Sequence, residues 1–352
     1  MTDLNLSSKY SNKIAKRFST ASFLAGNVSN EYDFAGVKSL VIYTPKTVDL
    51  TDYDRTAAVN RFGTPVEMED SIQELVMSQD KGFSITIDKG NNDDQMMIKE
   101  AGKMLNLQIA EKVVPWMDKY ALGQFIKQAG TIAGTAEAPT EDTIIGDIFA
   151  AATVLDNEMV PAENRFLYIK ASVYNMLRQA KEFMGADSLM EKNLAKGVVG
   201  QIADMRVIKM PDSYFPANAY FLIAYKDSVI MPNKIKTARV LHEVPGLDGA
   251  LLEGRNYFDA FVLGAKAMGV YALVDAAYIC ATPTIVVGEN TATIECSVEN
   301  AEIKYTLDGT DPRYSKSAKI YSGAIENLLD GDVVKAYAVK DGMFASAVAV
   351  GA

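Results

Sequence analysis

The sequence predicts an α+β protein that ends in a small, separate β module. Over roughly the first 280 residues, apolar side chains recur both at helical spacings and at the period of two that is typical of strands. From residue 283 onward the helical spacing disappears, and short apolar stretches alternate with polar turns. The chain has 352 residues, enough for more than one domain. We therefore place a domain boundary near residue 282 and a second domain at 283–352.

Composition and charge narrow the class of protein further. Hydrophobic residues make up 49% and charged residues 23% of the chain, as in ordinary globular proteins. No run of about 18 apolar residues occurs, so we expect no transmembrane helix and no membrane partner. The two cysteines, Cys280 and Cys296, are too few for a disulfide framework. A net charge of −10 argues against a protein that coats nucleic acid with most of its surface.

Residues 1–36 are polar and rich in Ser and Asn, and we expect them to form an extended N-terminal arm. The basic side chains near its start are Lys9, Lys13, Lys16 and Arg17. Two interpretations stay open, a basic arm that contacts nucleic acid and a solvated terminus. The arm lacks the apolar segment of a secretory signal, so we expect folding in a cytoplasm. A strand follows at Ser39–Pro45 and ends at its proline.

Residues 62–92 predict a long, two-stranded extended hairpin. In "FSITID", apolar residues alternate with polar ones, and "SIQELVM" can pair with this stretch across "SQDKG". An isolated hairpin is only marginally stable in water, so this one is expected to pack on a neighbouring copy of the chain or on its own domain. The residues expected at an inter-subunit contact are Leu75, Met77, Lys81, Phe83, Ile85 and Ile87.

The longest helical pattern covers residues 93–128. Its apolar stripe consists of Ile98, Ala101, Leu105, Ile109, Val113 and Trp116. Asp93 or Asp94 can cap the start of this helix. Pro115 is expected to kink or end it near Val114, because proline lacks the N–H that an interior helical position needs. Residues 130–139 are expected to form a loop.

Helical and strand patterns then alternate. The expected helices cover 143–157 and 172–183, and the expected strands cover 164–170, 205–210 and parts of 219–232. Long strand patterns return within 236–282, with Gly264 and Gly269 as bends.

A search for catalytic residues gives little. His242 is the single histidine, and no nucleotide-binding, zinc-protease or serine-hydrolase motif occurs. We therefore assign no catalytic, cofactor-binding or metal-binding residues and expect a protein that is not an enzyme. The segment "DGTDP" at 308–312 has two carboxylates that suggest calcium, but its spacing differs from a calcium loop, and a tight turn is the favoured interpretation.

The order of these elements resembles that of the HK97-fold major capsid proteins of tailed bacteriophages. "RFGTPVEMED" followed by "FSITID" looks like an extended loop that leads into a spine helix. "MVPAENRFLYIKASVYNMLRQAKEF" is similar to a segment common in these coat proteins, with a P-x-x-x-R turn, a buried strand and a helix. "GVVGQIADMRVIKMP" resembles the glycine-rich stretch that follows, although Ala203 or Asp204 replaces its third glycine. The resemblance covers about residues 30–280.

The resemblance implies a domain plan within 37–282. It places the extended loop at 62–92, the spine helix and peripheral domain at 93–128, the axial domain at 140–235 and returning peripheral strands at 236–282. It also implies a structural major capsid protein that self-assembles into the hexamers and pentamers of an icosahedral phage head around double-stranded DNA. The implied partners are copies of the chain, a portal, scaffolding or decoration proteins, and packaged DNA touched by the N-terminal arm. The implied location is the virion, after assembly in the host bacterial cytoplasm.

The C-terminal module resembles the Ig-like domain at the C-terminus of chitobiase and of many bacterial surface proteins. The resemblance lies in "IKYTLDGTDPRYSKSAKIYSGAI" and "VVKAYAVKDGMFAS". Its turn motif consists of Tyr305, Asp308, Gly309, Asp311, Pro312 and Tyr321. It implies an Ig-like β-sandwich exposed on the shell, either as an ornament without a ligand or as a weak glycan binder. In either role, deletion of 283–352 is expected to leave assembly largely intact.

An alternative class is an extracellular carbohydrate-binding or adhesive protein with an accessory Ig-like module. That class predicts a signal peptide and a pair of catalytic carboxylates on a barrel, and neither pattern is visible in the sequence.

Overall fold

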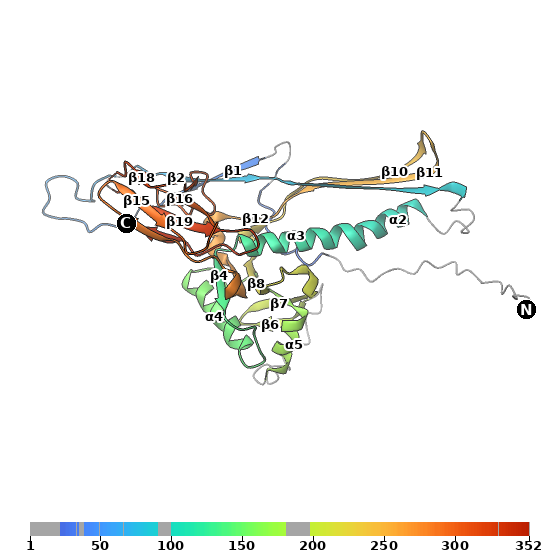
Figure 1. The fold of residues 1–352 in the computed structure, drawn as a ribbon, viewed down its shortest axis with the longest axis horizontal. Helices are drawn as coiled ribbons and strands as arrows, with labels where there is room; N and C mark the ends of the chain where they lie inside the picture. The colour runs from blue at the N-terminus through green and yellow to red at the C-terminus, as the bar shows by residue number, and fades with distance from the viewer. Residues whose placement is uncertain are drawn as a thin grey trace, which may run out of the picture.

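The computed structural model describes residues 22–32, 34, 39–48, 50–65, 67–90, 100–180, 198–329 and 331–351. A central six-stranded sheet with helices on both faces carries a long helical rod and a three-stranded sheet on one side. A β-sandwich lies at the other end of the molecule, beside a two-stranded hairpin (Figure 1). The basic residues predicted for the arm and the predicted Asp93 or Asp94 cap lie outside the described residues.

The central sheet has the strand order β4-β13-β8-β5-β7-β6. Its strands are β4 (Thr131–Thr135), β13 (Val270–Asp275), β8 (Ala219–Tyr225), β5 (Arg165–Lys170), β7 (Met205–Met210) and β6 (Val198–Ile202). β4 runs parallel to β13 and β5 parallel to β7, while the other neighbours are antiparallel. The expected strands within 140–235 are therefore confirmed, whereas 130–139 was expected to be a loop and instead contains β4.

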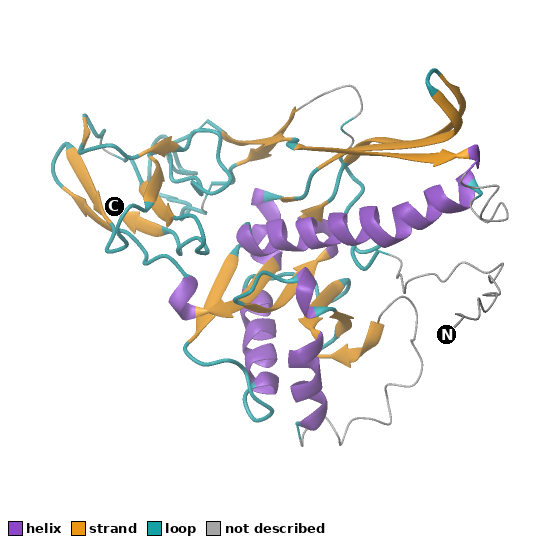
Figure 2. Ribbon diagram, turned by 45° about the vertical axis from the view of Figure 1, so that its right-hand side comes forward, coloured by secondary structure: helices purple, strands orange, loops and turns teal. Residues whose placement is uncertain are grey.

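Helices cover both faces of this sheet. All six residues of β5 are buried, and alternate side chains enter two different cores. Phe166 and Tyr168 pack with α3 (Val114–Lys127), whereas Leu167 and Ile169 pack with α4 (Ile144–Asn157) and α5 (Ala171–Gln179). Figure 2 shows α4 and α5 side by side below the sheet and the long rod above it. Each such buried apolar side chain contributes about 1.5–3 kcal/mol to stability.

The helical rod consists of α2 (Ala101–Gln108), a π turn (Ile109–Val113) and α3. The predicted helix at 93–128 is thus present where the structure describes it, and it does not end at Pro115, although a π turn interrupts the α-helix near the expected position. The π turn lies directly before that proline, and the Val114 N–H bonds to the Ile109 carbonyl, five residues back. The wider turn lets the rod continue where an α turn would clash with the proline ring.

A three-stranded sheet packs against α2. Its order is β10 (Asn233–Val244), β11 (Leu247–Phe258) and β3 (Gln79–Asp88). Ile87 of β3 and Leu252 of β11 are buried with Leu105 of α2. The returning strands predicted within 236–282 are confirmed for β10 and β11, but residues 270–275 belong to the central sheet instead.

The predicted hairpin between "SIQELVM" and "FSITID" is wrong. β2 (Asp70–Val76) pairs with β1 (Ser39–Pro45), whereas β3 pairs with β11. The predicted turn glycine, Gly82, lies inside β3, opposite Arg255. The alternating pattern identified each strand correctly, but it carries no information about which strand is the partner.

The C-terminal module is a two-sheet sandwich, as predicted for 283–352. One sheet contains β14 (Thr284–Val287), β15 (Thr291–Glu295) and β18 (Ile325–Glu326). The other contains β17 (Lys319–Ile320), β16 (Glu302–Thr306), β19 (Val334–Val339) and β20 (Ala349–Gly351). Its core consists of Ala292, Ile294, Ile325, Leu328, Val334 and Ala336.

The described end of the N-terminal segment, residues 22–32, is held on α3 by Asp118. This buried carboxylate accepts hydrogen bonds from the Ser22 hydroxyl (2.6 Å) and the Phe23 N–H (2.8 Å). Phe23, Leu24 and Val28 then enter the main core. Burial raises the pKa of Asp118, although both hydrogen bonds act in the opposite direction.

A tight contact at Gly130 gives a first prediction. A Cβ at this position would lie 2.2 Å from the Ala267 carbonyl oxygen, while a Cβ at Gly123 in α3 would meet nothing within 4 Å. Gly130→Ala should destabilise the unassembled chain by about 1–3 kcal/mol, and Gly123→Ala should stabilise it by about 0.5–1 kcal/mol. Thermal unfolding measures both; equal melting temperatures for the two variants would contradict the packing described at Gly130.

The raised pKa of Asp118 gives a second prediction. Since its folded pKa lies above its unfolded value, its contribution to stability is complete below the unfolded pKa and is lost as pH rises through the folded pKa. Compared with Asp118→Asn, the wild type should therefore be relatively more stable at about pH 4 than at about pH 7. Melting temperatures of both proteins across this range test it, and a difference that is independent of pH would refute it.

Candidate functional site

The β1–β2 hairpin is the feature that projects farthest from the body at the sandwich end of the molecule. Its strands are antiparallel, with Ser39 opposite Val76 and Pro45 opposite Asp70. Loop 46–69 joins them, and Figure 1 shows this loop extending past the C-terminal module, at the end opposite α2. A two-stranded sheet of this kind needs outside support to be stable in water.

Loop 46–69 presents apolar side chains to solvent. They are Val48, Leu50, Tyr53, Val59, Phe62 and Met68. Leu50 is fully exposed and Phe62 is 84% exposed. An exposed apolar group of this size on one projecting loop is typical of a protein interaction surface.

The loop nevertheless has internal order. The Asp54 carboxylate accepts hydrogen bonds from the Thr56 hydroxyl (2.6 Å) and from the N–H groups of Thr56 and Ala57. These bonds, that from the Thr56 hydroxyl first, lower the pKa of Asp54. The Thr51 hydroxyl donates to the Phe62 carbonyl, and the Phe62 ring lies 4.8 Å from that of Tyr53. The apolar side chains are therefore displayed by a turn with its own hydrogen bonds.

The base of the hairpin is packed into the body. Leu75 and Met77 are buried in a cluster with Phe34, Ile230 and Leu263. The Gln73 side chain donates to the Val262 carbonyl (3.0 Å) and accepts from the Gly264 N–H (2.8 Å). The hairpin thus leaves the body from a fixed base.

Asp259 holds the joint between β2 and β3. Its carboxylate is only 3% exposed and accepts hydrogen bonds from the Ser78 N–H (2.7 Å), the Tyr120 hydroxyl (2.8 Å) and the Ala260 N–H (2.8 Å). Burial is the main cause of the raised pKa of Tyr120. The joint at Ser78, where the chain passes from one sheet to the next, is therefore attached to α3 by a charged acceptor.

The six residues predicted at an inter-subunit contact lie in two different places. Leu75 and Met77 are covered by this chain itself, so they are not displayed on the surface. On β3, Ile87 is buried, Phe83 and Ile85 are half-buried, and Lys81 is exposed with its ammonium 5.4 Å from the Trp116 ring. Ile87 is likewise covered by this chain, in a cluster with Leu105 and Leu252. The inter-subunit contact itself stays a prediction. The apolar residues of loop 46–69 were missed, and their signal was the recurrence of single large apolar residues in an otherwise polar segment between two strands.

The turn motif of the sandwich is built from its own hydrogen bonds. The Asp308 carboxylate accepts from Thr310 and from the Ser317 hydroxyl, and Gly309 has the positive φ (+68°) that the turn requires. Burial would raise the pKa of Asp308, but these hydrogen bonds outweigh it and lower the pKa. Asp311 instead binds Arg313. Both carboxylates thus have protein donors, which favours the tight turn over a calcium site.

The aromatic residues of the motif face inward. The rings of Tyr305 and Tyr321 meet edge to face at 6.1 Å and pack against the sandwich core. The Tyr321 hydroxyl accepts a hydrogen bond from the Ile294 N–H. Pro312 is buried. These residues therefore stabilise the sandwich.

Across the described residues, no group of three or more His, Cys, Asp and Glu side chains is placed to hold a metal ion. His242 is an exposed residue of β10. No helix in the described part of the chain has the length and apolar character needed to cross a bilayer.

The family model of the chitobiase/beta-hexosaminidase C-terminal domain matches residues 283–350. This range begins at the predicted domain boundary and covers both sheets of the sandwich. No curated protein matches the chain.

Solved structures from phages have a similar fold. A chain of Mycobacterium phage Che8 matches with a TM-score of 0.61 and 14% identity, over 78% of this chain and 98% of that chain. The capsid structure of the cyanophage P-SCSP1u gives a TM-score of 0.63 with 13% identity, over 77% of this chain and 93% of that chain. The mature capsid of bacteriophage PhiM1 gives a TM-score of 0.59 with 11% identity, over 76% of this chain and 91% of that chain. The chain therefore shares its fold with phage capsid structures.

The joint at Ser78 gives a third prediction. Asp259→Ala removes the acceptor of the Ser78 N–H, the Tyr120 hydroxyl and the Ala260 N–H. Each buried donor that is left without an acceptor should lower the free energy of unfolding by about 1–3 kcal/mol. Hydrogen exchange of the amides near Ser78 should become faster. Asp80→Ala is the matched control, since it removes only an exposed ion pair with Arg255 on β11. Equal exchange near Ser78 in the two variants would show that Asp259 does not hold the joint.

Proposed function

We propose that this chain is the structural major capsid protein of a tailed bacteriophage, with the HK97 fold. The observation that carries the proposal is the similarity of fold to phage capsid structures over about three quarters of the chain. The exposed apolar loop at the end of the β1–β2 hairpin adds a surface that a self-assembling protein requires. The chain would then act through contacts with copies of itself.

The elements have the following roles in this proposal. The β1–β2 hairpin with loop 46–69 is the extended loop, in place of the range 62–92. The α2–α3 rod is the spine helix, and with β3, β10 and β11 it forms the peripheral domain. The central sheet with α4 and α5 forms the axial domain.

The physical basis of the proposal is that a single chain leaves the apolar side chains of loop 46–69 exposed to water. Apolar side chains of loop 46–69 gain their buried area only when another molecule covers them. Repeated contacts between unlike surfaces of identical chains close into rings when the rotation allows it. Hexamers and pentamers of an icosahedral head around double-stranded DNA are the assembly that we infer. Portal and scaffolding partners, DNA contact by the N-terminal arm and location in the virion belong to the same proposal.

The exposed loop provides the test of this function. Wild-type protein should form capsomers or shells, and the triple variant Leu50→Ser, Val59→Ser, Phe62→Ser should fold normally but fail to assemble, since these side chains are exposed in the single chain. Negative-stain microscopy and sedimentation measure assembly, and circular dichroism measures the fold. Leu329→Ser, which removes an equally exposed apolar side chain from the sandwich, is the control. Normal shells from the triple variant would exclude loop 46–69 as an assembly contact, and a wild type that stays monomeric would overturn the function.

A further inference from the structure

The Ig-like module lies directly against the open edge of the hairpin. Its Lys316 N–H donates to the Ile72 carbonyl of β2 (2.7 Å), and the Lys316 ammonium lies 2.9 Å from the Glu74 carboxylate. This ion pair lowers the pKa of Glu74. At the loop end of the hairpin, the Lys46 ammonium binds both Glu69 (3.1 Å) and the Asp308 carbonyl (3.0 Å). The module thus supplies the lateral contact that a two-stranded ribbon lacks.

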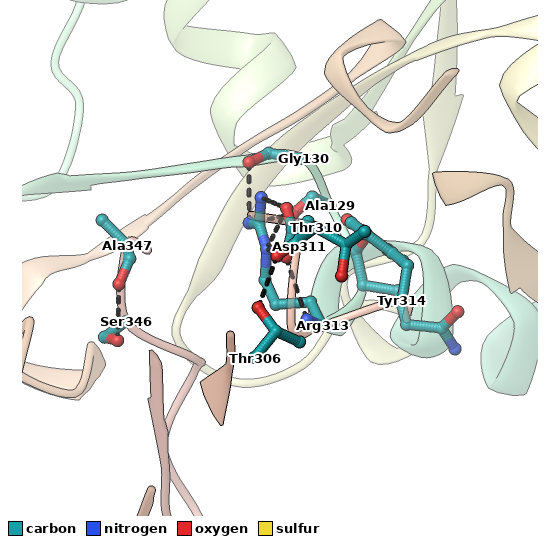
Figure 3. A network of polar contacts seen from close by, with 10 residues as sticks. Ala129, Gly130, Thr306, Thr310, Asp311, Arg313, Tyr314, Ser346 and Ala347 are labelled. Atoms are coloured by element: carbon teal, nitrogen blue, oxygen red, sulfur yellow. Dashed lines mark hydrogen bonds and ion pairs between the residues drawn. The ribbon is translucent and has the colours of Figure 1, made fainter. Parts of the chain in front are cut away.

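The same module is attached to the end of α3. The Arg313 side chain, 13% exposed, is held by Asp311 and donates to the carbonyls of Ala129 (3.2 Å) and Gly130 (2.8 Å). The Tyr314 hydroxyl donates to the Gln128 carbonyl (2.7 Å). Gln128 is the C-cap of α3, and the last carbonyls of a helix have no partners within it, so the Tyr314 hydroxyl supplies a donor that the helix lacks. Arg313 binds the two carbonyls that follow the helix end (Figure 3).

A third contact region prevents the module from pivoting about these anchors. Phe344 enters the main core, and its backbone pairs with Tyr278 and Cys280 through two hydrogen bonds. At Gly264, an added Cβ would lie 2.7 Å from the Tyr314 Cβ and 3.3 Å from the Gln73 amide oxygen. The loop at Gly264 is therefore in direct contact with the hairpin and the module at this point, and residues of all three also line a pocket beside it.

From these contacts we propose that the Ig-like module is a brace that fixes the direction of the β1–β2 hairpin relative to α3. Its bracing surface consists of Asp308, Arg313, Tyr314 and Lys316. A braced hairpin presents loop 46–69 at one angle, and an unbraced one samples many angles. This inference goes beyond the proposed function and rests on it only for the consequence in assembly. It replaces the expectation that the module is dispensable for assembly.

Hydrogen exchange of the unassembled full-length chain tests the brace without any reference to shells. Lys316→Glu should increase amide exchange across 70–76 by about twofold or more, because two carboxylates then face each other. Glu74→Lys combined with Lys316→Glu should restore wild-type exchange. Lys319→Glu, an exposed substitution on the same module, should have no effect.

Tyr314→Phe tests whether the module acts on the hairpin as one body or only through the local Lys316–Glu74 contact. It removes only the hydrogen bond to the end of α3, and it should still increase exchange across 70–76, since the module then loosens as a body. Unchanged exchange in this variant, or in Lys316→Glu, would overturn the proposal.

Shell formation then reports the consequence for assembly. If the wild type assembles, Lys316→Glu should yield fewer closed shells, and the charge-swapped double variant should recover them. Equal shell yield from Lys316→Glu would contradict the effect of the brace on assembly. If the wild type does not assemble, the capsid function fails, while the exchange measurements still decide whether the brace exists.

Discussion

The C-terminal end of α3 is the junction on which the arrangement of the whole molecule depends. The Gln128 side-chain amide donates to the Ala260 carbonyl and accepts from the Val262 N–H, and the Gln128 backbone carbonyl accepts from the Tyr314 hydroxyl of the sandwich. Two residues later, the Gly130 N–H donates to the Ala267 carbonyl. The two backbones are so close here that a Cβ on residue 130 would clash with that carbonyl. Because buried backbone groups must be paired, these bonds fix the central sheet, the returning chain and the C-terminal module around one helix end.

This junction explains how a thin chain segment can project rigidly. The hairpin has only two strands, so its own hydrogen bonds do not determine its direction. Direction comes instead from buried side chains at its base, from Asp259 at the joint with β3 and from the module along its edge. Apolar groups at the far end of such a segment stay largely exposed in the single chain. Their placement is consistent with stability that is gained between chains.

Sequence patterns predicted helices and strands well where the burial of side chains determines them. They did not predict which strands or side chains that are distant in the sequence contact each other. β5 was found because a strand covered on both faces has an almost continuous apolar stretch, whereas β4, "TIAGT", was missed because Ile132 is its only large apolar residue. Period-two alternation identified β2 and β3 but not their partners. The turn motif identified the sandwich, yet no local pattern indicates that Arg313 binds a carbonyl 183 residues away.

The π turn before Pro115 has a consequence for the face that α2 turns toward its sheet. A π turn is equivalent to one residue inserted into an α-helix, and each residue of an α-helix advances the azimuth by roughly 100°. Leu105 therefore owes its contact with Leu252 to this surplus residue. Removal of one residue from 109–113 would turn that leucine about a quarter of a revolution away from β11 and would also remove the wider turn that accommodates Pro115.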